Sequence, residues 1–385
     1  MKTATRSTPL LLLAALTLTA CAPASAPAPT ASPSPSPSST PTPTATVDPL
    51  AGMSLPDKVG QMFMVGTSVE GATATTLAAV RDDHVGGIFL HGRSDAGSQA
   101  TAELIGQFTS AVGVAAPQLW VATDQEGGTV QVLTGPGFDR IPSAVEQATQ
   151  TDEALRSSAA TWSEQLAQAG VNMNLAPVAD IVTSPEFAAS NPPIGALARE
   201  YGYDDASVAT KVGAFAAGMR DGGVMPTLKH FPGLGHVDEN TDTRTGVTDD
   251  TVTADGADVS VYASVLPQGD AIVMMSTAIY AQIDPSAPAA FSPAVVNVLR
   301  DRVGFDGVIT VDDLSAARQV QPWSPADRAT LAVDAGVDLL LVSADPSVYP
   351  EMRQAVLSRA ESDPAFAAKV DAAARRIVEQ KASMP

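Results

Sequence analysis

The chain has 385 residues, of which 22 are Lys or Arg and 42 are Asp or Glu, so its formal net charge is −20. This acidic balance argues against binding to nucleic acid or electrostatic binding to anionic lipid, since both present negative charge. The single cysteine excludes an internal disulfide. The four histidines form no cluster with metal-ligand spacing, so we expect neither a metal nor another cofactor.

Residues 1–20 have the composition of a secretory signal peptide. A basic start is followed by an apolar run, Leu10 to Leu18, that is too short to remain as a membrane span. Leu18-Thr19-Ala20-Cys21 resembles the lipobox of bacterial lipoproteins, which implies that Cys21 is lipidated and holds the protein on the outer face of the cell membrane. The alternative is a plain signal peptide cut elsewhere, which leaves the only cysteine without a role.

After Cys21, residues 22–47 are almost wholly Ala, Pro, Ser and Thr, and they have no charged side chain. Such a segment cannot bury a core, so we predict a disordered tether, partly in the polyproline-II conformation. At about 3.1 Å per residue its extended reach is roughly 80 Å. We expect residues 48–385 to form one domain, in contact with the membrane only through the lipid anchor.

The remaining sequence alternates short apolar runs with Ala-rich segments of helical periodicity, such as 157–169, 206–220 and 326–335. The apolar runs predicted as strands are 62–66, 87–90, 119–123, 173–176, 224–228, 271–275, 308–311 and 337–342. Continuous apolar strands alternating with helices indicate parallel strands that are covered on both faces. Eight such units predict an α/β fold, the (β/α)8 TIM barrel.

Polar side chains gather just after several of these strands, where a barrel places its catalytic groups. The stretch from Leu228 to Arg244 contains a lysine, an imidazole, glycines and acids with no apolar periodicity. Acids also close other strands, at Asp124, at Asp180 and at Asp312-Asp313. A helix N-cap is an alternative role for Asp180 and Asp313, and a polar loop with a buried histidine is the alternative for the long stretch.

Five motifs in order resemble those of glycoside hydrolase family 3, in particular its single-domain β-N-acetylglucosaminidase branch. They are Asp124-Gln125-Glu126-Gly127-Gly128, Asn174-Leu175-Ala176-Pro177-Val178-Ala179-Asp180, Asn191-Pro192-Pro193-Ile194-Gly195, Lys229-His230-Phe231-Pro232-Gly233 and Gly304-Phe305-Asp306-Gly307-Val308-Ile309-Thr310-Val311-Asp312-Asp313-Leu314. The resemblance runs from about Leu55 to the C-terminus. It implies a TIM barrel that removes terminal N-acetylglucosamine from peptidoglycan fragments.

The resemblance also implies roles for individual residues. Asp312 stands at the position of the nucleophilic aspartate, which in a retaining glycosidase faces the anomeric carbon about 5 to 5.5 Å from a proton donor. The sugar-binding positions of the family match Asp124, Arg199, Lys229 and His230.

The chain departs from the family at the acid/base. Where that branch has Asp-Ser-His, with the histidine as acid/base, this sequence has Asn240-Thr241-Asp242. Asp242 is a candidate replacement, because a carboxyl group with a raised pKa is the ordinary acid/base of other glycosidases. His236 and Glu239 on the same stretch are alternatives, as is the loss of any acid/base.

Other departures are Leu234 in place of the histidine of Gly-His-Gly and Val132 in place of the arginine after Gly-Gly-x-Val-Gln. They leave the sugar preference open.

The sequence therefore predicts a monomeric, surface-tethered, retaining exo-β-N-acetylhexosaminidase that acts on cell-wall glycan or muropeptide fragments. One alternative is a catalytically impaired lipoprotein that only binds glycan in the same barrel. Another is a β-glycosidase of different sugar specificity.

Overall fold

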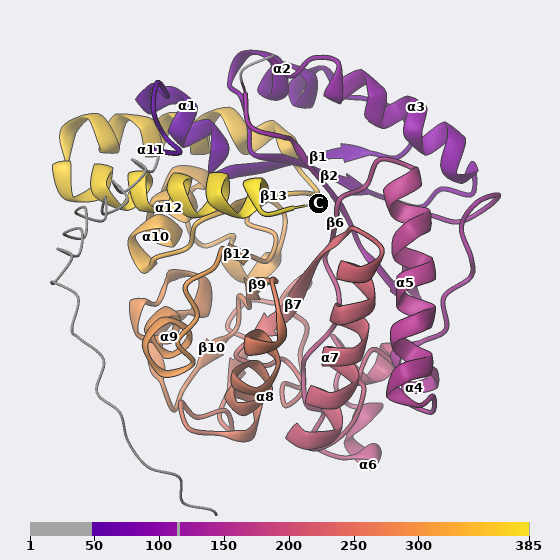
Figure 1. The fold of residues 1–385 in the computed structure, drawn as a ribbon. Coiled ribbons are helices and arrows are strands. Elements are labelled where there is room, and N and C mark those ends of the chain that lie inside the picture. The colour runs from indigo at the N-terminus through magenta and orange to yellow at the C-terminus, as the bar shows by residue number, and fades with distance from the viewer. Residues whose placement is uncertain (1–47, 114–115, 385) are drawn as a thin grey trace, which may run out of the picture. The chain divides into compact units, whose positions relative to one another are not determined.

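The computed structural model describes residues 48–113 and 116–384. Its main sheet has eight parallel strands whose spatial order follows their order along the chain. These strands are β1 (Phe63–Ser68), β2 (Gly87–His91), β3 (Trp120–Thr123), β6 (Met173–Asn174), β7 (Met225–Phe231), β9 (Ile272–Met275), β12 (Ile309–Val311) and β13 (Leu340–Val342). Strand β13 pairs with β1, and a parallel bridge from Thr310 to Leu339 joins β12 to the start of β13. The sheet therefore closes into a barrel (Figure 1).

Each of the eight predicted strands overlaps one of these strands, so the prediction of a (β/α)8 barrel is confirmed. Ends differ by up to three residues. The most informative difference is at β7, which continues past Leu228 to Phe231 because its main chain keeps pairing with β9, with an irregular register between Lys229 and Phe231. The polar residues Lys229 and His230 therefore belong to the strand itself.

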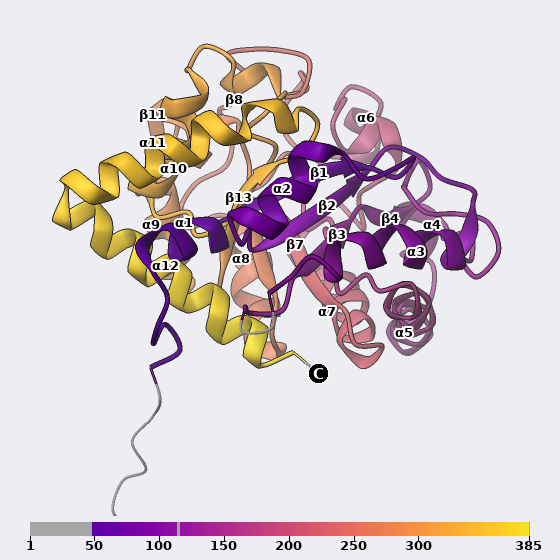
Figure 2. The same ribbon diagram turned by 90° about the horizontal axis from the view of Figure 1, so that it is seen from above.

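Helices surround the sheet in both ribbon views (Figures 1 and 2). They are α1 (Leu55–Gln61), α2 (Ala74–Asp82), α3 (Gly97–Thr109), α4 (Ala144–Gln147), α5 (Asp152–Gln168), α6 (Pro185–Ala188), α7 (Asp205–Asp221), α8 (Ala257–Val265), α9 (Pro293–Asn297), α10 (Pro325–Ala335), α11 (Tyr349–Ser362) and α12 (Pro364–Ala382). Small additional strands are the hairpin β4 (Gln125–Gly127) and β5 (Val130–Gln131), and the group β8 (Thr248–Asp249), β10 (Ile279–Tyr280) and β11 (Asp284–Pro288). Two single-turn 3-10 helices, η1 (Gly195–Leu197) and η5 (Arg318–Val320), lie in loops near the site.

The helices begin at residues whose side chains cap free N–H groups. Thr151, Asp204 and Ser324 accept hydrogen bonds from the first turns of α5, α7 and α10. Ser54 and Asp57 form a reciprocal capping box at the start of α1. Such caps each stabilise a helix by roughly 1 kcal/mol and fix where it starts.

Helices α5 and α7 pack closely because α7 has a glycine at their contact. A Cβ atom at Gly218 would collide with the backbone carbonyl of Arg156 and lie 2.6 Å from the Cβ of Ala159. The absent side chain therefore lets the two backbones approach.

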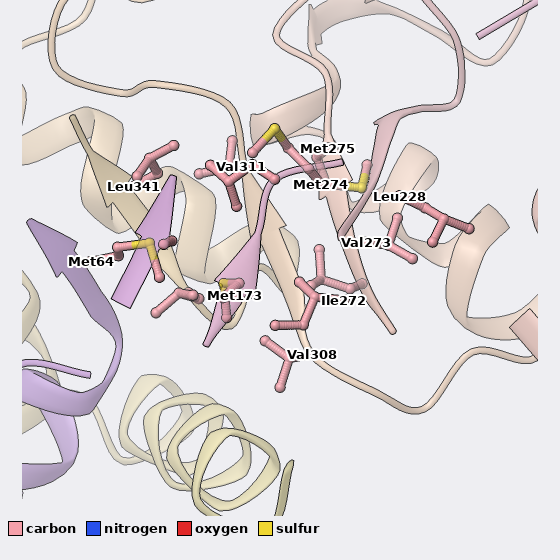
Figure 3. Close-up of a cluster of buried hydrophobic side chains, with 14 of the residues drawn as sticks. Met64, Met173, Leu228, Ile272, Val273, Met274, Met275, Val308, Val311 and Leu341 are labelled. Atoms are coloured by element: carbon pink, nitrogen blue, oxygen red, sulfur yellow. The ribbon is translucent and has the colours of Figure 1, made fainter. Parts of the chain in front are cut away.

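The core is formed by apolar side chains from the barrel strands (Figure 3). Met64, Met173, Leu228, Val273 and Met275 are among its fully or almost fully buried members. Near the amino ends of the strands, Lys381 of α12 donates to the Oε1 of Gln61 and to the carbonyl of Gly86. This packing leaves the carboxyl ends of the strands open for a site.

The predicted signal peptide (1–20), the tether (21–47) and Cys21 lie outside the described residues. Within 48–113 and 116–384, the structure has no helix that is both long and apolar enough to cross a membrane.

Candidate active site

A cavity of about 410 Å³ lies at the carboxyl ends of the barrel strands. Its lining includes these residues predicted for the site: Asp124, Arg199, Lys229, His230, Asp242 and Asp312. They come from β7 and from the segments that follow β3, β6, β7 and β12. The barrel thus brings together residues that are up to 188 positions apart in the sequence.

Lys229 is buried beneath two carboxylates at one side of the cavity. Its Nζ lies 2.6 Å from Oδ1 of Asp124 and 2.6 Å from Oε1 of Glu126. Burial would lower the pKa of Lys229, but the charges of Asp124 and Glu126 raise it above its ordinary value. The lysine is therefore a fixed cation, and it orients the partly exposed carboxylate of Asp124 toward the cavity.

Arg199 reaches the same cluster from the loop after η1. Its guanidinium donates to both oxygens of Glu126, at 2.8 and 2.7 Å, and to the carbonyl of Pro193 at 2.7 Å. Burial alone would raise the pKa of Glu126, but Arg199 and Lys229 hold that pKa at about 2. Glu126 therefore keeps both cations in place.

The sequence reasoning did not identify Glu126 as a site residue, although it stands two positions after Asp124 in the same motif. Alternation along an extended chain places positions two apart on the same side. That spacing is the signal that could have identified it.

His230 is oriented by a buried aspartate. Asp180 accepts from Nδ1 of His230 at 2.7 Å, and its other oxygen accepts from the backbone N–H groups of His230 and Leu234 at 3.0 Å each. Burial would raise the pKa of Asp180, but the charge and hydrogen bonds of His230 lower it. Asp180 is therefore no helix cap. It places the imidazole, whose Nε2 remains available to the cavity.

Asp312 and Asp313 are adjacent in the sequence and differ in what they bind. Asp313 accepts at one oxygen from the N–H and Oγ of Ser315 and the N–H of Ser343, and at the other from the N–H of Ala316. Asp312 accepts at Oδ1 from the N–H of Asp313, at 2.8 Å. Asp313 thus holds the loop, and Asp312 is the carboxylate that can act on a ligand.

Asp242 stands at the mouth of the cavity, on the loop after β7. Partial withdrawal from water, followed by the negative charge of Asp312, raises the pKa of Asp242 to about 6, although His230 and Arg199 act in the opposite direction. Solvent still reaches the side chain. A carboxyl group of this pKa can hold a proton near neutral pH and exchange it with water.

His236 and Glu239, the alternatives to Asp242, do not line the cavity. His236 contacts Oγ1 of Thr183 at 2.8 Å through Nδ1 and the carboxylate of Asp258 at 3.1 Å through Nε2. Glu239 is exposed and lies 3.7 Å from Arg244. Both side chains are engaged away from the cavity, and this weakens them as acid/base candidates.

Apolar side chains also line the cavity, together with the polar residues Asn240, Thr241 and Ser343. The apolar side chains include Phe89, Val130, Leu175, Leu234, Met274 and Leu341. Leu234 therefore presents an apolar surface to the cavity at the position where the Gly-His-Gly motif of glycoside hydrolase family 3 has a histidine. A cavity lined by both charged and apolar side chains suits a ring with hydroxyls and an apolar substituent or face.

Within 48–113 and 116–384, no group of three or more His, Cys, Asp or Glu side chains has the arrangement of a metal site.

Comparisons with known proteins identify the family of this chain. The "Glycosyl hydrolase family 3 N terminal domain" matches residues 54–380. The β-hexosaminidase LpqI of Mycobacterium tuberculosis is 33% identical over 319 residues, which cover 79% of this chain and 78% of LpqI. A β-N-acetylhexosaminidase from Beutenbergia cavernae, known from a crystal structure, is 56% identical in sequence to this chain. The two structures superpose with a TM-score of 0.85, and the match covers 86% of this chain and 99% of that one. The chain therefore belongs to glycoside hydrolase family 3.

Proposed function

We propose that this glycoside hydrolase is a retaining exo-β-N-acetylhexosaminidase. The observation that supports this most directly is that one cavity holds two carboxyl groups in different environments, Asp312 and Asp242. Pairs of carboxyl groups with separated pKa values divide the roles of nucleophile and acid between them. The similarity to named β-N-acetylhexosaminidases supports the choice of sugar.

In the first step, Asp312 attacks the anomeric carbon while Asp242 gives its proton to the glycosidic oxygen that departs. The glycosidic bond breaks, and an ester bond forms between the sugar and Asp312. The negative charge of Asp312 helps Asp242 keep its proton until this moment, because two nearby carboxylates repel each other.

In the second step, Asp242 is an anion and takes a proton from water, which attacks the ester and releases the sugar. A carboxylate at this position repels an anionic acceptor such as phosphate by a few kcal/mol at short range in a partly dry site. We therefore expect transfer to water.

The charged side of the cavity holds the sugar during both steps. Asp124 accepts hydrogen bonds from ring hydroxyls, while Lys229, Arg199 and His230 donate to hydroxyl or acetamide oxygens. Glu126 keeps Lys229 and Arg199 fixed before the substrate arrives, and Asp180 does the same for His230. Fixed donors lose little entropy on binding.

Hydrolysis of an aryl N-acetyl-β-glucosaminide and the matching aryl β-glucoside, measured side by side, tests this function. We expect turnover of both to require Asp312 and kcat/KM to favour the N-acetylated sugar. Preference for the glucoside would indicate a β-glycosidase of other specificity. Tight binding without turnover of either would support the alternative of a glycan-binding protein.

The cellular setting is a further part of the proposal. We infer that residues 1–20 are a lipoprotein signal, that Cys21 is lipidated, and that residues 21–47 tether a monomeric catalytic domain (48–385) to the outer face of the cell membrane. The lipobox and the uncharged Pro-rich composition support this inference. In that position the enzyme meets cell-wall glycan and muropeptide fragments as substrates.

A further inference from the structure

The segment Asn240–Val247, here called the acid loop, holds Asp242 and is mostly exposed. Residues 242–246 are exposed, while Thr241 and Val247 at its two ends are buried. Within the loop, Asn240 accepts from the backbone N–H groups of Asp242, Thr243 and Arg244, which form a local turn. These bonds do not join the loop to the barrel, and exposed loops open at low cost. The placement of Asp242 therefore depends on what holds the two ends.

Both ends are bound by the same short element, η5. The backbone N–H of Arg318 donates to the carbonyl of Asp242 at 3.2 Å, and the N–H of Gln319 donates to the carbonyl of Thr241 at 3.0 Å. At the other end, the side chain of Gln319 accepts from the N–H of Val247 at 3.0 Å and donates to its carbonyl at 3.1 Å.

Gln319 is 2% exposed, so its amide makes these two bonds in a setting that water barely reaches. A buried amide that loses both partners leaves a donor and an acceptor unsatisfied, which is unfavourable. If the acid loop moves away from η5, the side chain of Gln319 must either become exposed to water or stay buried without hydrogen-bond partners.

The chain leading into η5 also contains the proposed nucleophile. Asp312 precedes Gln319 by seven positions, and the hydrogen bonds of Asp313 to Ser315 and Ala316 fix the intervening turn. The two carboxyl groups of the proposed reaction are thus connected through one rigid segment.

We propose that Gln319 is a positioning residue that latches the acid loop to the nucleophile segment and so sets the location of Asp242 relative to Asp312. The proposal rests on the role proposed above for Asp242. Gln319 does not line the cavity. Its effect on catalysis passes through the loop.

Limited trypsin digestion reports how often the acid loop opens, independently of catalysis, because Arg244 is exposed near the middle of that loop. Gln319→Leu removes both side-chain bonds at similar volume. We expect cleavage after Arg244 to become about 10-fold or more faster than in the wild type, since each bond lost favours the open loop. Mass spectrometry separates this product from cleavage at Arg318.

Gln321→Leu is the matched control, since Gln321 lies two positions on and donates to the carbonyl of Ser315 instead of the acid loop. Its cleavage rate after Arg244 should stay at the wild-type value. Gln319→Glu keeps the acceptor for the N–H of Val247 and loses the donor, so it should show a partial effect and serves if Gln319→Leu does not fold.

The catalytic readout compares a substrate with a poor leaving group against an activated aryl glycoside. Displacing the acid by about 1 Å can cost on the order of 100-fold in rate, and only the poor leaving group needs the proton. Gln319→Leu should therefore lower kcat for the poor substrate about 10- to 100-fold, with a smaller change for the activated one and little change in KM.

The pH profile should also move. The charged groups that influence Asp242 are Asp312, Asp313, His230 and Arg199. Once released toward water, Asp242 loses the partial burial and the repulsion from Asp312 that raise its pKa, so the alkaline limb of the profile should shift to lower pH. A purely structural role for Gln319 would lower rates without moving this limb.

The outcomes separate this inference from the proposed function. If Asp242→Ala shows the selective loss while Gln319→Leu shows neither that loss nor faster cleavage, the latch is wrong and the acid/base assignment stands. If Gln319→Leu speeds cleavage and Asp242→Ala affects both substrates equally, the acid/base assignment is wrong. In that case Gln319 still holds the acid loop, but the proposal that it positions a catalytic acid is overturned.

Discussion

Asp312 and Asp313 are neighbours with the same side chain, and the structure separates their roles through hydrogen bonds. Both residues line the cavity, but four donors occupy both oxygens of Asp313, whereas Asp312 accepts, among the described residues, only from the N–H of Asp313. The backbone N–H of Asp312 also donates to the carbonyl of Met275 at 3.0 Å, which ties it to the neighbouring strand. The proposed nucleophile is thus held in place and needs little reorganisation to react.

Asp312→Asn should lower kcat by 10³-fold or more, a loss of about 4 kcal/mol in transition-state stabilisation. An amide has the shape of the carboxylate but is a poor nucleophile, so KM should change little. A slow-leaving 2-fluoro glycoside followed by peptide mapping identifies the labelled side chain. A label on Asp313 would contradict the assignment.

Asp242 should give the wild-type enzyme an alkaline limb near pH 6, because it must be protonated to donate to the leaving oxygen. Its pKa is raised, so the acid form persists up to about pH 6 and is lost as the pH rises further. Asp242→Ala should remove this limb and slow substrates with poor leaving groups far more than activated aryl glycosides.

Azide provides the check on Asp242→Ala. A small anion can enter the space left by the carboxylate and attack the ester on Asp312 without a general base. We expect azide to restore turnover of the activated substrate in Asp242→Ala and to have little effect on Glu239→Ala, the control on the same stretch. Equal loss on both substrates without rescue would point to a structural role.

At the scale of elements, β7 combines core and site in one strand. Leu228 packs in the barrel core, and the next two residues, Lys229 and His230, line the cavity. Buried ion pairs compensate Lys229, and Asp180 compensates His230. Charged residues at the end of a buried strand remain because each has its partner.

The close contact between α5 and α7 predicts that replacing its glycine destabilises the protein, although alanine is the better helix former. Gly218→Ala should lower stability by about 1–3 kcal/mol, because the added methyl group collides with the backbone of α5. Gly106→Ala in α3 is the matched control, since a Cβ atom there has no neighbour within 4 Å. It should raise stability by about 0.5–1 kcal/mol through helix propensity.

Urea unfolding of both variants checks this pair. The two changes are chemically identical, so a difference in sign isolates the packing of α5 against α7 from the propensity of alanine. If both variants are stabilised, the two helices are not in the close contact described.

At the scale of the whole molecule, the net charge and the proposed lipid anchor both bear on whether the protein binds to the membrane. With a formal net charge of −20, the protein gains nothing from electrostatic binding to an anionic membrane. A lipid group on Cys21 is therefore the feature that would hold it there. Two or more acyl chains give stable anchoring, whereas one gives only marginal binding.

Cys21→Ala should release the protein from the membrane fraction and leave the catalytic domain unchanged. Fractionation of cells that express each form measures the first effect. The melting temperature and the kcat of the purified domain (48–385) serve as the control for the second. A variant that stays with the membrane would show that something other than Cys21 anchors the chain.

The amino-acid sequence by itself determined the barrel, because its signals are local. Apolar runs of strand length, Ala-rich periodic helices and capping residues such as Ser54 and Asp204 act within a few positions, so they could be recognised without a structure. The family motifs likewise pointed to the residues that gather at the cavity. Strand ends were less accurate, as at β7, where pairing with β9 continues past the apolar run.

Only the tertiary structure decided which polar residues face the cavity and which hold it together. Glu126 became visible as the partner of Arg199 and Lys229, and Asp180 as the partner of His230, because these pairs join residues 50 to 103 positions apart. Partial burial and the charge of Asp312 also raise the pKa of Asp242, and no local sequence pattern encodes either of them. Burial and distance between remote charges depend on closure of the barrel, and that is why the sequence alone could not assign them.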